Sequence, residues 1–308
     1  MNRKLEMQDT SENQQSITNS AENFFVNSAC IGCEVCSQLA PDMFSVIVSH
    51  AVVIQQPEQQ EDKRRAFHAL LACPTAAIGS REKEGLSTAL TDFPLLLAEN
   101  VYDCGFTSAK SYGGHSYFIE HPDGNWLIDS PRFVPALAKK LSELGGVRTI
   151  FLTHYDDAEH ADAVIYAKKF GAERIVHIEE QSRIGKQSRT SQQEAAEHLI
   201  KGNAPVNWHP DFRFLIVPGH TKGHMLLLYK GKYLFTGDHL FWQKRTQSLG
   251  AIREYCWYSW PEQVKSMERL AKEEFEWVLP RHGDQIQLEA SQMKPAMERL
   301  LQHMNEID

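Results

Sequence analysis

Four cysteines in the first quarter of the chain constrain its fold more than any other feature. They occur as Cys30-Ile-Gly-Cys33-Glu-Val-Cys36 and, further along, as Cys73-Pro74. Three thiolates at this close spacing can surround one small centre, and a cubane iron–sulfur cluster needs four. The fixed φ and missing N–H of Pro74 help to shape the turn that presents the fourth. The spacing therefore predicts one iron–sulfur cluster.

A structural zinc site and unliganded cysteines are the alternatives. Zinc sites usually arrange their cysteines as separated pairs rather than as an overlapping triplet. The pattern resembles the single-cluster bacterial ferredoxins. In two-cluster ferredoxins a Cys-Pro ligand serves the other cluster, but this chain has no second set of cysteines, so Cys73 is expected to close the same cluster. The complete set of four favours a four-iron cluster over a three-iron one.

Composition limits the remaining possibilities. The net charge of −8 argues against nucleic acid as a partner, because phosphate binding needs a basic face. Residues 1–22 are polar, lack the apolar core of a signal peptide and are predicted to be disordered. No apolar stretch is long enough to span a bilayer. We therefore expect a cytoplasmic protein with no membrane or nucleic-acid partner, and the sequence leaves its oligomeric state open.

The pattern of apolar residues predicts two domains. Residues 23–80 form a cysteine-containing domain with a strand pair over Phe44–Ile54 and a helix over Glu58–Ala72. The polar stretch 81–92 is assigned to a linker. Residues 93–308 begin with a hairpin around Pro122-Asp123-Gly124 and continue as alternating strands and helices, which is typical of a layered domain with sheet packed on sheet.

A second set of potential metal ligands follows the strands of the larger domain. Each of four motifs comes at or just after the end of an apolar strand, where imidazoles and carboxylates point into one cleft and suit zinc or iron. The motifs are His154-Tyr-Asp156-Asp157-Ala-Glu159-His160, Gly219-His220-Thr221-Lys-Gly223-His224, Gly237-Asp238 and Pro280-Arg281-His282-Gly283.

The order of these motifs resembles the metallo-β-lactamase superfamily across residues 95–285. The Gly-His-Thr-x-Gly-His form is similar to the glyoxalase II branch. The resemblance implies a four-layer αββα sandwich, so the fold class is α+β, with a small ferredoxin-like domain in front of that sandwich. Together with the N-terminal cysteines, the chain looks like a ferredoxin–metallo-hydrolase fusion.

The superfamily resemblance also implies a ligand set. It places His154 and His220 at one metal, His160 and His282 at a second, and Asp238 as the bridge between them. The first loop departs from the usual His-x-His-x-Asp-His. Asp156 stands in place of a histidine, and Glu159-His160 comes one residue late, so that Asp157 is an alternative to Glu159. One or two zinc or iron ions are expected.

Hydrolysis of a small ester or thioester is the first functional hypothesis, with Asp238 and a loop carboxylate, Asp157 or Glu159, positioning water. Redox chemistry is the second, because two histidines and one carboxylate also hold non-haem iron, and persulfide dioxygenases of the same superfamily look like this at the metal. A non-catalytic redox-sensing or binding module is the third. The expected partners are a small-molecule substrate and, if the cluster transfers electrons, a redox protein.

For the remaining histidines and for the aromatic residues, the sequence predicts mainly supporting or structural roles. His224 and His239 are expected to support the ligands. Trp257, Tyr258 and Trp260 are expected in the core, with substrate lining by Tyr258 as an alternative. The segment Gln181–Gly202 is expected to shape the pocket. A surface or structural role is assigned to His115, His121, His177 and His209.

Overall fold

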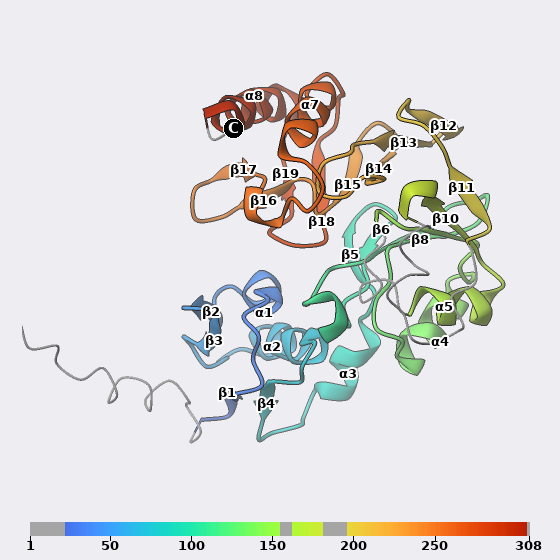
Figure 1. The fold of residues 1–308 in the computed structure, drawn as a ribbon. Helices are drawn as coiled ribbons and strands as arrows, with labels where there is room; N and C mark the ends of the chain where they lie inside the picture. The colour runs from blue at the N-terminus through green and yellow to red at the C-terminus, as the bar shows by residue number, and fades with distance from the viewer. Residues whose placement is uncertain (1–21, 155–161, 181–195, 307–308) are drawn as a thin grey trace, which may run out of the picture. The chain divides into compact units, whose positions relative to one another are not determined.

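The computed structural model describes residues 22–154, 162–180 and 196–306 (Figure 1). The chain divides into two compact units, Met1–Thr91 and Asp92–Asp308. All but the last residue of the expected disordered lead-in lies outside the described residues. In the part of the chain that is described, no helix has the length and apolar character needed to cross a membrane.

The first unit is built around one long helix. The pattern-based prediction of a strand pair and a helix is confirmed, because β2 and β3 form an antiparallel hairpin and α2 buries Phe67 against the ring of Phe24, with centroids 5.1 Å apart. Strands β1 and β4 pair antiparallel and bring the two ends of the unit together. The elements are β1 (Phe24–Val26), α1 (Val35–Leu39), β2 (Phe44–Ile47), β3 (His50–Val53), α2 (Gln60–Ala72), β4 (Ile78–Ser80) and α3 (Leu86–Thr91).

Helix α3 lies within the stretch 81–92 that the sequence assigns to a linker. Ala89 is buried and Leu86 packs against the core of the first unit, where α3 contacts α2. The polar residues from Arg81 to Glu84 come directly before α3, and they make the apolar spacing of Leu86 and Ala89 difficult to recognise in the sequence. The segment is therefore part of the first unit.

Two sheets form the centre of the second unit. The described strands of the first sheet follow the order β11-β10-β9-β8-β7-β6-β5, and those of the second follow β12-β13-β14-β15-β18-β19. The first sheet contains β5 (Leu95–Ala98), β6 (Val101–Asp103), β7 (Tyr117–Ile119), β8 (Trp126–Ile128), β9 (Thr149–Phe151), β10 (Glu173–His177) and β11 (His198–Ile200). The second contains β12 (Val206–His209), β13 (Phe212–Ile216), β14 (Met225–Tyr229), β15 (Tyr233–Gly237), β18 (Trp277–Pro280) and β19 (Ile286–Gln287).

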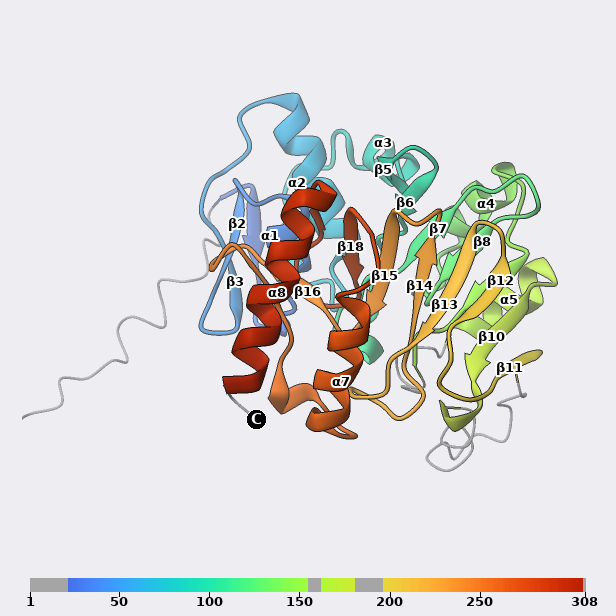
Figure 2. The ribbon, with the colours of Figure 1, turned by 90° about the horizontal axis from the view of Figure 1, so that it is seen from above.

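The two sheets pack face to face through buried aromatic and aliphatic side chains. Trp126 of β8 stacks on Phe212 of β13, with ring centroids 4.0 Å apart. Helices α7 (Trp260–Leu270) and α8 (Ala290–Glu306) bury a separate apolar layer on the outer face of the second sheet. Helices α4 (Pro135–Glu143) and α5 (Ala163–Phe170) lie beside the first sheet (Figures 1 and 2). The predicted αββα sandwich is confirmed.

Four further short elements belong to the described part of the second unit. Strands β16 (Phe241–Gln243) and β17 (Ser248–Gly250) form a separate hairpin, and the 3₁₀ turns η2 (Ala109–Ser111) and η3 (Arg253–Tyr255) lie in loops. Helix α4 begins at Pro135, although the apolar pattern of the sequence predicts a helix over Pro131–Leu144. The N–H of Arg132 bonds to the carbonyl of Phe106 and the N–H of Phe133 to the carboxylate of Asp162, so tertiary contacts hold this segment extended.

The topology brings the ends of several strands to one edge of the sandwich. Strand β15 is parallel to β18, so Asp238 and His282, which follow these strands, emerge on the same side. Strand β14 is antiparallel to β15, which places its first residues and the preceding loop at that edge as well. The loop before β14 carries His220, and β9 in the other sheet leads into His154. The edge therefore collects imidazoles and carboxylates from four separate segments.

Candidate metal centres

The four cysteines of the first unit line one cavity. Cys36 and Cys73 are buried, and Cys30 and Cys33 are partly exposed. Backbone N–H groups already point at two of the sulfur atoms. The N–H groups of Gly32 and Ala51 donate to Sγ of Cys30 at 3.4 and 3.2 Å, and that of Ala77 donates to Sγ of Cys73 at 3.3 Å. Such donors stabilise negative sulfur and tune the potential of an iron–sulfur cluster.

Gly32 makes the cysteine loop possible. Its φ is +70°, and a Cβ at this position would lie 2.4 Å from the carbonyl oxygen of Ser49. Only glycine adopts this conformation without strain and also permits so close an approach. The glycine in Cys30-Ile-Gly-Cys33 is therefore required by the turn that brings the cysteines together.

Two thiols of this cavity, those of Cys33 and Cys36, resist ionisation when no metal is bound. Burial, together with a smaller effect of the neighbouring cysteines, raises the pKa of Cys33 to about 11 and that of Cys36 to about 12. Four thiols crowded into one buried site are stabilised by metals that bind thiolate. The donor set fits the predicted iron–sulfur cluster.

In the second unit, two histidines and one aspartate converge. The Nε2 atoms of His154 and His220 each lie 3.5 Å from Oδ2 of Asp238, and Nε2 of His282 lies 4.0 Å from the same oxygen. One ligand atom from each of His154, His220 and Asp238 lies within 4.8 Å of the others. The two histidines are buried, and the side chain of His282 is 33% exposed. The centre thus has a buried side and a side open to solvent.

A backbone carbonyl fixes the tautomer of His220. Its Nδ1 atom lies 2.6 Å from the carbonyl oxygen of Tyr255. A carbonyl only accepts hydrogen bonds, so Nδ1 carries the proton. In the neutral ring Nε2 then keeps its lone pair, directed toward Asp238.

A hydroxyl group fixes the tautomer of His154. Oγ1 of Thr153 lies 3.0 Å from Nδ1 of His154 and 3.0 and 3.1 Å from the two carboxylate oxygens of Asp129. The hydroxyl has one proton, which it donates to the carboxylate, and so it accepts the proton of Nδ1. The lone pair of Nε2 in His154 is therefore also available to a metal.

The neighbours of Asp238 hold its backbone in place. Its N–H donates to Nε2 of His224 at 3.3 Å, which agrees with the supporting role expected for His224. Gly237 has a φ of +51°, and a Cβ there would lie 2.6 Å from Nε2 of His224 and 2.8 Å from Oγ1 of Thr153. Burial lowers the pKa of His239 to about 3, so this ring stays neutral.

The donor atoms fit a metal ion. Oδ1 of Asp238 is buried and has no hydrogen-bond partner among the described residues. Two imidazole lone pairs and a carboxylate are donors that both zinc and iron accept. The other predicted ligands and the second predicted catalytic carboxylate lie outside the described residues: Asp156, Asp157, Glu159 and His160. Their roles stay predictions.

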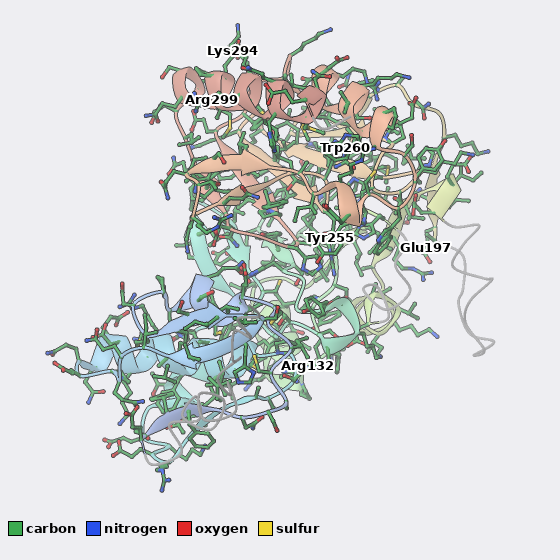
Figure 3. The ribbon with its side chains drawn as sticks, turned by 60° about the vertical axis from the view of Figure 1, so that its left-hand side comes forward. Arg132, Glu197, Tyr255, Trp260, Lys294 and Arg299 are labelled. Carbon is green, nitrogen blue, oxygen red and sulfur yellow. The ribbon has the colours of Figure 1, made fainter. Side chains whose placement is uncertain are left out.

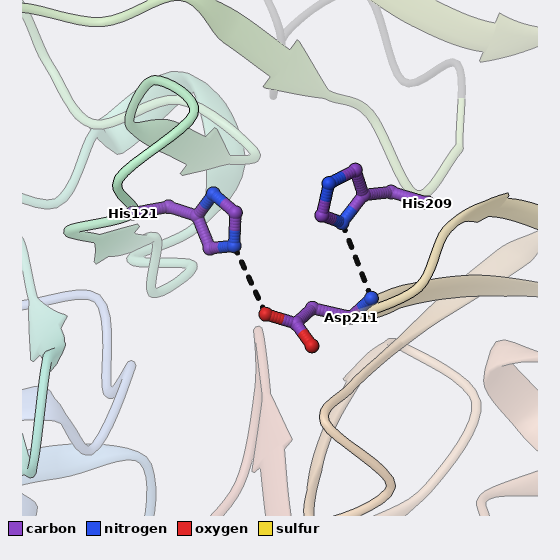
Figure 4. A group of neighbouring side chains, drawn as sticks. All are labelled: His121, His209 and Asp211. Atoms are coloured by element: carbon purple, nitrogen blue, oxygen red, sulfur yellow. Dashed lines mark hydrogen bonds and ion pairs between the residues drawn. The ribbon is translucent and has the colours of Figure 1, made fainter.

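A second His-His-Asp group, at the opposite end of the strands, has a different character (Figure 4). His121-Pro-Asp123 and His209-Pro-Asp211 occupy the β7–β8 and β12–β13 turns. Each histidine accepts the N–H of its own aspartate at Nδ1, at 3.2 Å. Nε2 of His121 lies 3.1 Å from the carboxylate of Asp211, and Nε2 of His209 lies 3.3 Å from that of Asp123.

These crossed contacts already use both nitrogens of each ring. Because Nδ1 accepts a backbone proton, Nε2 of the neutral ring carries the proton and donates it to the carboxylate of the other motif. No lone pair is left for a metal in this tautomer. The pair joins the turns of the two sheets, in agreement with the structural role expected for His121 and His209.

The other two histidines expected to be structural are buried. Nδ1 of His115 lies 2.8 Å from the carboxylate of Asp103, and Nε2 of His177 lies 3.0 Å from the carbonyl oxygen of Gly202.

Two of the three aromatic residues expected in the core lie at the surface instead. Trp260 is buried as expected, but Trp257 and Tyr258 are 50% and 42% exposed, so their assignment to the core is wrong. Their backbone N–H groups bond to the carbonyl of His220, which keeps both rings at the surface.

Comparisons with known proteins agree with the fold described for each of the two units. Residues 26–80 match the family model described as the 4Fe-4S single cluster domain of Ferredoxin I. No curated protein matches the chain. The first unit thus contains a single-cluster 4Fe-4S domain of the ferredoxin type, as predicted.

Solved structures show the fold of the rest of the chain. A metallo-β-lactamase from Hirschia baltica covers 67% of this chain with 96% of its own, at 13% identity and a TM-score of 0.50. One from Pontibacter korlensis covers 68% with 97% of its own, also at 13% identity and a TM-score of 0.50. VMB-1 covers 69% with 95% of its own, at the same identity and score. The second unit has the metallo-β-lactamase fold.

Proposed function

We propose that the second unit is a metal-dependent hydrolase of a small ester or thioester-type substrate, and that the ferredoxin domain gives it a redox-linked role. The observation that carries the proposal is the convergence of His154, His220 and Asp238 at strand ends of a metallo-β-lactamase fold. His282, with Nε2 4.0 Å from Oδ2 of Asp238, extends the same group toward solvent. His160 is the further ligand that the sequence predicts.

A zinc or iron ion bound there supplies Lewis acidity, which polarises a carbonyl oxygen and makes water a stronger nucleophile near neutral pH. The protein keeps protons on Nδ1 of His154 and His220 through Thr153 and the carbonyl of Tyr255. Asp238 contributes a carboxylate whose backbone is held by His224. Asp157 or Glu159, from the first loop, is the proposed partner of Asp238 in positioning water.

The proposed role of the first unit is to hold a [4Fe-4S] cluster on Cys30, Cys33, Cys36 and Cys73. Such a cluster supplies or accepts single electrons. A structural or sensing role for the cluster is the alternative.

A non-haem iron oxidoreductase is the second candidate function. Two histidines and one carboxylate are a known donor set for iron(II) enzymes, and this is the set that converges in the second unit. A [4Fe-4S] cluster that transfers single electrons would serve such chemistry. The two candidates differ in the metal that occupies the second unit.

Metal and sulfide analysis of the anaerobically purified protein tests both candidates. We expect iron and acid-labile sulfide in equal amounts, and zinc in addition. We also expect hydrolysis of ester or thioester substrates that Asp238→Asn abolishes while the cluster stays. Iron in excess of sulfide would favour the oxidoreductase. If the protein holds no metal beyond the cluster, the proposed hydrolase and the oxidoreductase are both wrong.

Cys33→Ser tests the cluster separately. We expect this variant to lose the brown absorbance and most of its sulfide. Cys256→Ser is the matched control. Sγ of Cys256 donates to the carbonyl of Gly219 at 3.1 Å, a contact that a serine hydroxyl can reproduce. A cluster that survives Cys33→Ser would contradict the ligand assignment.

A further inference from the structure

Three exposed aromatic residues lie in one short segment beside the proposed metal ligand His220. Tyr255, Trp257 and Tyr258 are 63%, 50% and 42% exposed. Among the described residues, these three account for all exposed large apolar side chains between Trp208 and the C-terminal end of α8. Clustered exposed aromatic residues mark binding sites more often than isolated ones do. Figure 3 labels Tyr255, near the start of this segment, and Trp260, with which α7 begins.

The segment is fixed by its backbone. The N–H of Trp257 bonds to the carbonyl of His220 at 3.0 Å, and the N–H of Ser259 bonds to the carbonyl of Gly219 at 3.1 Å. The carbonyl of Tyr255 accepts Nδ1–H of His220. The aromatic rings therefore project from a backbone that is already attached to the metal ligand. A rigid aromatic surface of this kind loses little conformational entropy when it binds a ligand.

The ring of Trp257 packs against the ring of the proposed metal ligand His220. Its centroid lies 4.5 Å from that of the His220 ring, and the two ring planes are inclined by 39°. The indole is therefore in contact with the imidazole of a proposed metal ligand, and half of the Trp257 surface remains exposed.

We propose that Trp257, with its chain neighbour Tyr258, forms a binding subsite for a planar aromatic group of the substrate. The inference rests on the proposed function, because it places the reacting group of the same molecule at His154, His220 and Asp238. Indole and phenol rings favour a flat ligand group, since stacked or edge-on aromatic pairs contribute beyond the area they bury. A bulky aliphatic group of similar size buries a comparable apolar area but makes no aromatic stacking interaction.

Calorimetric titration of the full-length, anaerobically purified protein with 2-naphthylacetate and cyclohexylacetate tests the subsite. Both probes carry the same carboxylate, and only the first carries a flat ring system. We expect the wild-type protein to prefer 2-naphthylacetate, and Trp257→Ala to weaken its binding about tenfold, which corresponds to about 1.4 kcal/mol. Trp257→Phe should keep most of the preference, and Tyr258→Ala should reduce it by a smaller factor.

Trp208→Ala is the matched control, because Trp208 is 39% exposed and lies on β12, away from His220 in the fold. It should leave both affinities unchanged. Metal content and the thermal unfolding temperature are measured for each variant. If Trp257→Ala weakens both probes equally and lowers metal content, Trp257 only supports His220 and the subsite does not exist. Unchanged affinities in Trp257→Ala also overturn the proposal.

The same titration separates this inference from the proposed function. A protein that holds metal in the second unit but shows no preference for the flat probe contradicts the subsite alone. A protein without that metal that still prefers 2-naphthylacetate, and loses the preference with Trp257→Ala, contradicts the hydrolase and supports the aromatic subsite.

Discussion

The carbonyl oxygen of Tyr255 lies 2.6 Å from Nδ1 of His220, and two residues later the ring of Trp257 packs against the same imidazole. One short segment thus does two things. It fixes the tautomer that directs the lone pair of His220 toward Asp238, and it places an exposed aromatic ring beside it. The proposed metal site and the proposed binding subsite are therefore built on a shared piece of backbone.

Thr153→Val should weaken metal binding without unfolding the protein. Valine has nearly the shape of threonine, but it cannot accept Nδ1–H of His154 or donate to Asp129. Loss of such an orienting partner typically costs about 10- to 100-fold in metal affinity. Competition with a chelator measures the change. Thr149→Val, at the start of the same strand β9, is the control, and equal losses in both variants would contradict the assigned role of Thr153.

Gly237→Ala should destabilise the second unit more than Gly171→Ala does. Both glycines have positive φ, +51° and +66°, so both substitutions place alanine in a left-handed conformation that costs about 1–2 kcal/mol. At Gly237 the new Cβ would also lie 2.6 Å from Nε2 of His224, whereas nothing lies within 4 Å at Gly171. We expect the unfolding temperature to fall further, and metal to be lost, only in Gly237→Ala.

Tryptophan fluorescence measures this comparison for the second unit alone. All six tryptophans of the chain lie in residues 92–308. Equal destabilisation by the two alanine substitutions would show that the contact with His224 carries no energy.

Much of the fold follows from patterns within the sequence. Strands β7 and β8 have the bounds that apolar runs on either side of Pro122-Asp123-Gly124 predict, because local alternation and turn residues determine them. The cysteine site is equally local. Three of its four cysteines lie within seven residues, from Cys30 to Cys36. The group of His154, His220 and Asp238 is predictable because each residue follows an apolar strand, and strand ends meet at one edge of a layered sheet fold.

Interactions between distant segments are what the sequence does not reveal. Asp129 supports His154 through the hydroxyl of Thr153, although 25 positions separate Asp129 from His154. A local sequence pattern does not indicate a contact between residues so far apart. Trp257 has the composition of a core residue, yet the bonds of its backbone to His220 hold its ring at the surface. Burial depends on which segments meet, and the residue type alone does not decide it.

Asp103→Asn should reduce stability at neutral pH and have less effect in acid. Burial opposes ionisation of Asp103, but His115, the N–H of Gly105 and the amide of Gln285 outweigh it and lower the pKa of this carboxyl. A carboxyl with a lowered pKa in the folded state stabilises the protein above its ordinary pKa of about 3.9, and this contribution is lost as the pH falls through the folded value. Loss of hydrogen bonds to the charged group should cost about 1.5–3 kcal/mol at pH 7.

Denaturant unfolding of the wild-type protein and Asp103→Asn between pH 7 and pH 3 measures this difference. The two curves should approach each other at the acid end. A stability difference that stays constant across this range would mean that the carboxylate charge of Asp103 contributes nothing.

Arg281→Met should destabilise the second unit by about 3–5 kcal/mol, since it leaves a buried carboxylate without its nearby cation. Arg281 is 1% exposed and Asp129 2% exposed, and NH1 of the arginine lies 3.5 Å from Oδ2 of the aspartate.

A double-mutant cycle with Asp129→Asn tests this ion pair, because that substitution removes the negative charge that Arg281 neutralises. The double variant should therefore be more stable than the sum of the two single losses predicts, by about 0.5–3 kcal/mol in a double-mutant cycle. Denaturant unfolding followed by tryptophan fluorescence gives all four stabilities. Strictly additive losses would show that the ion pair between Arg281 and Asp129 contributes no coupling energy to folding.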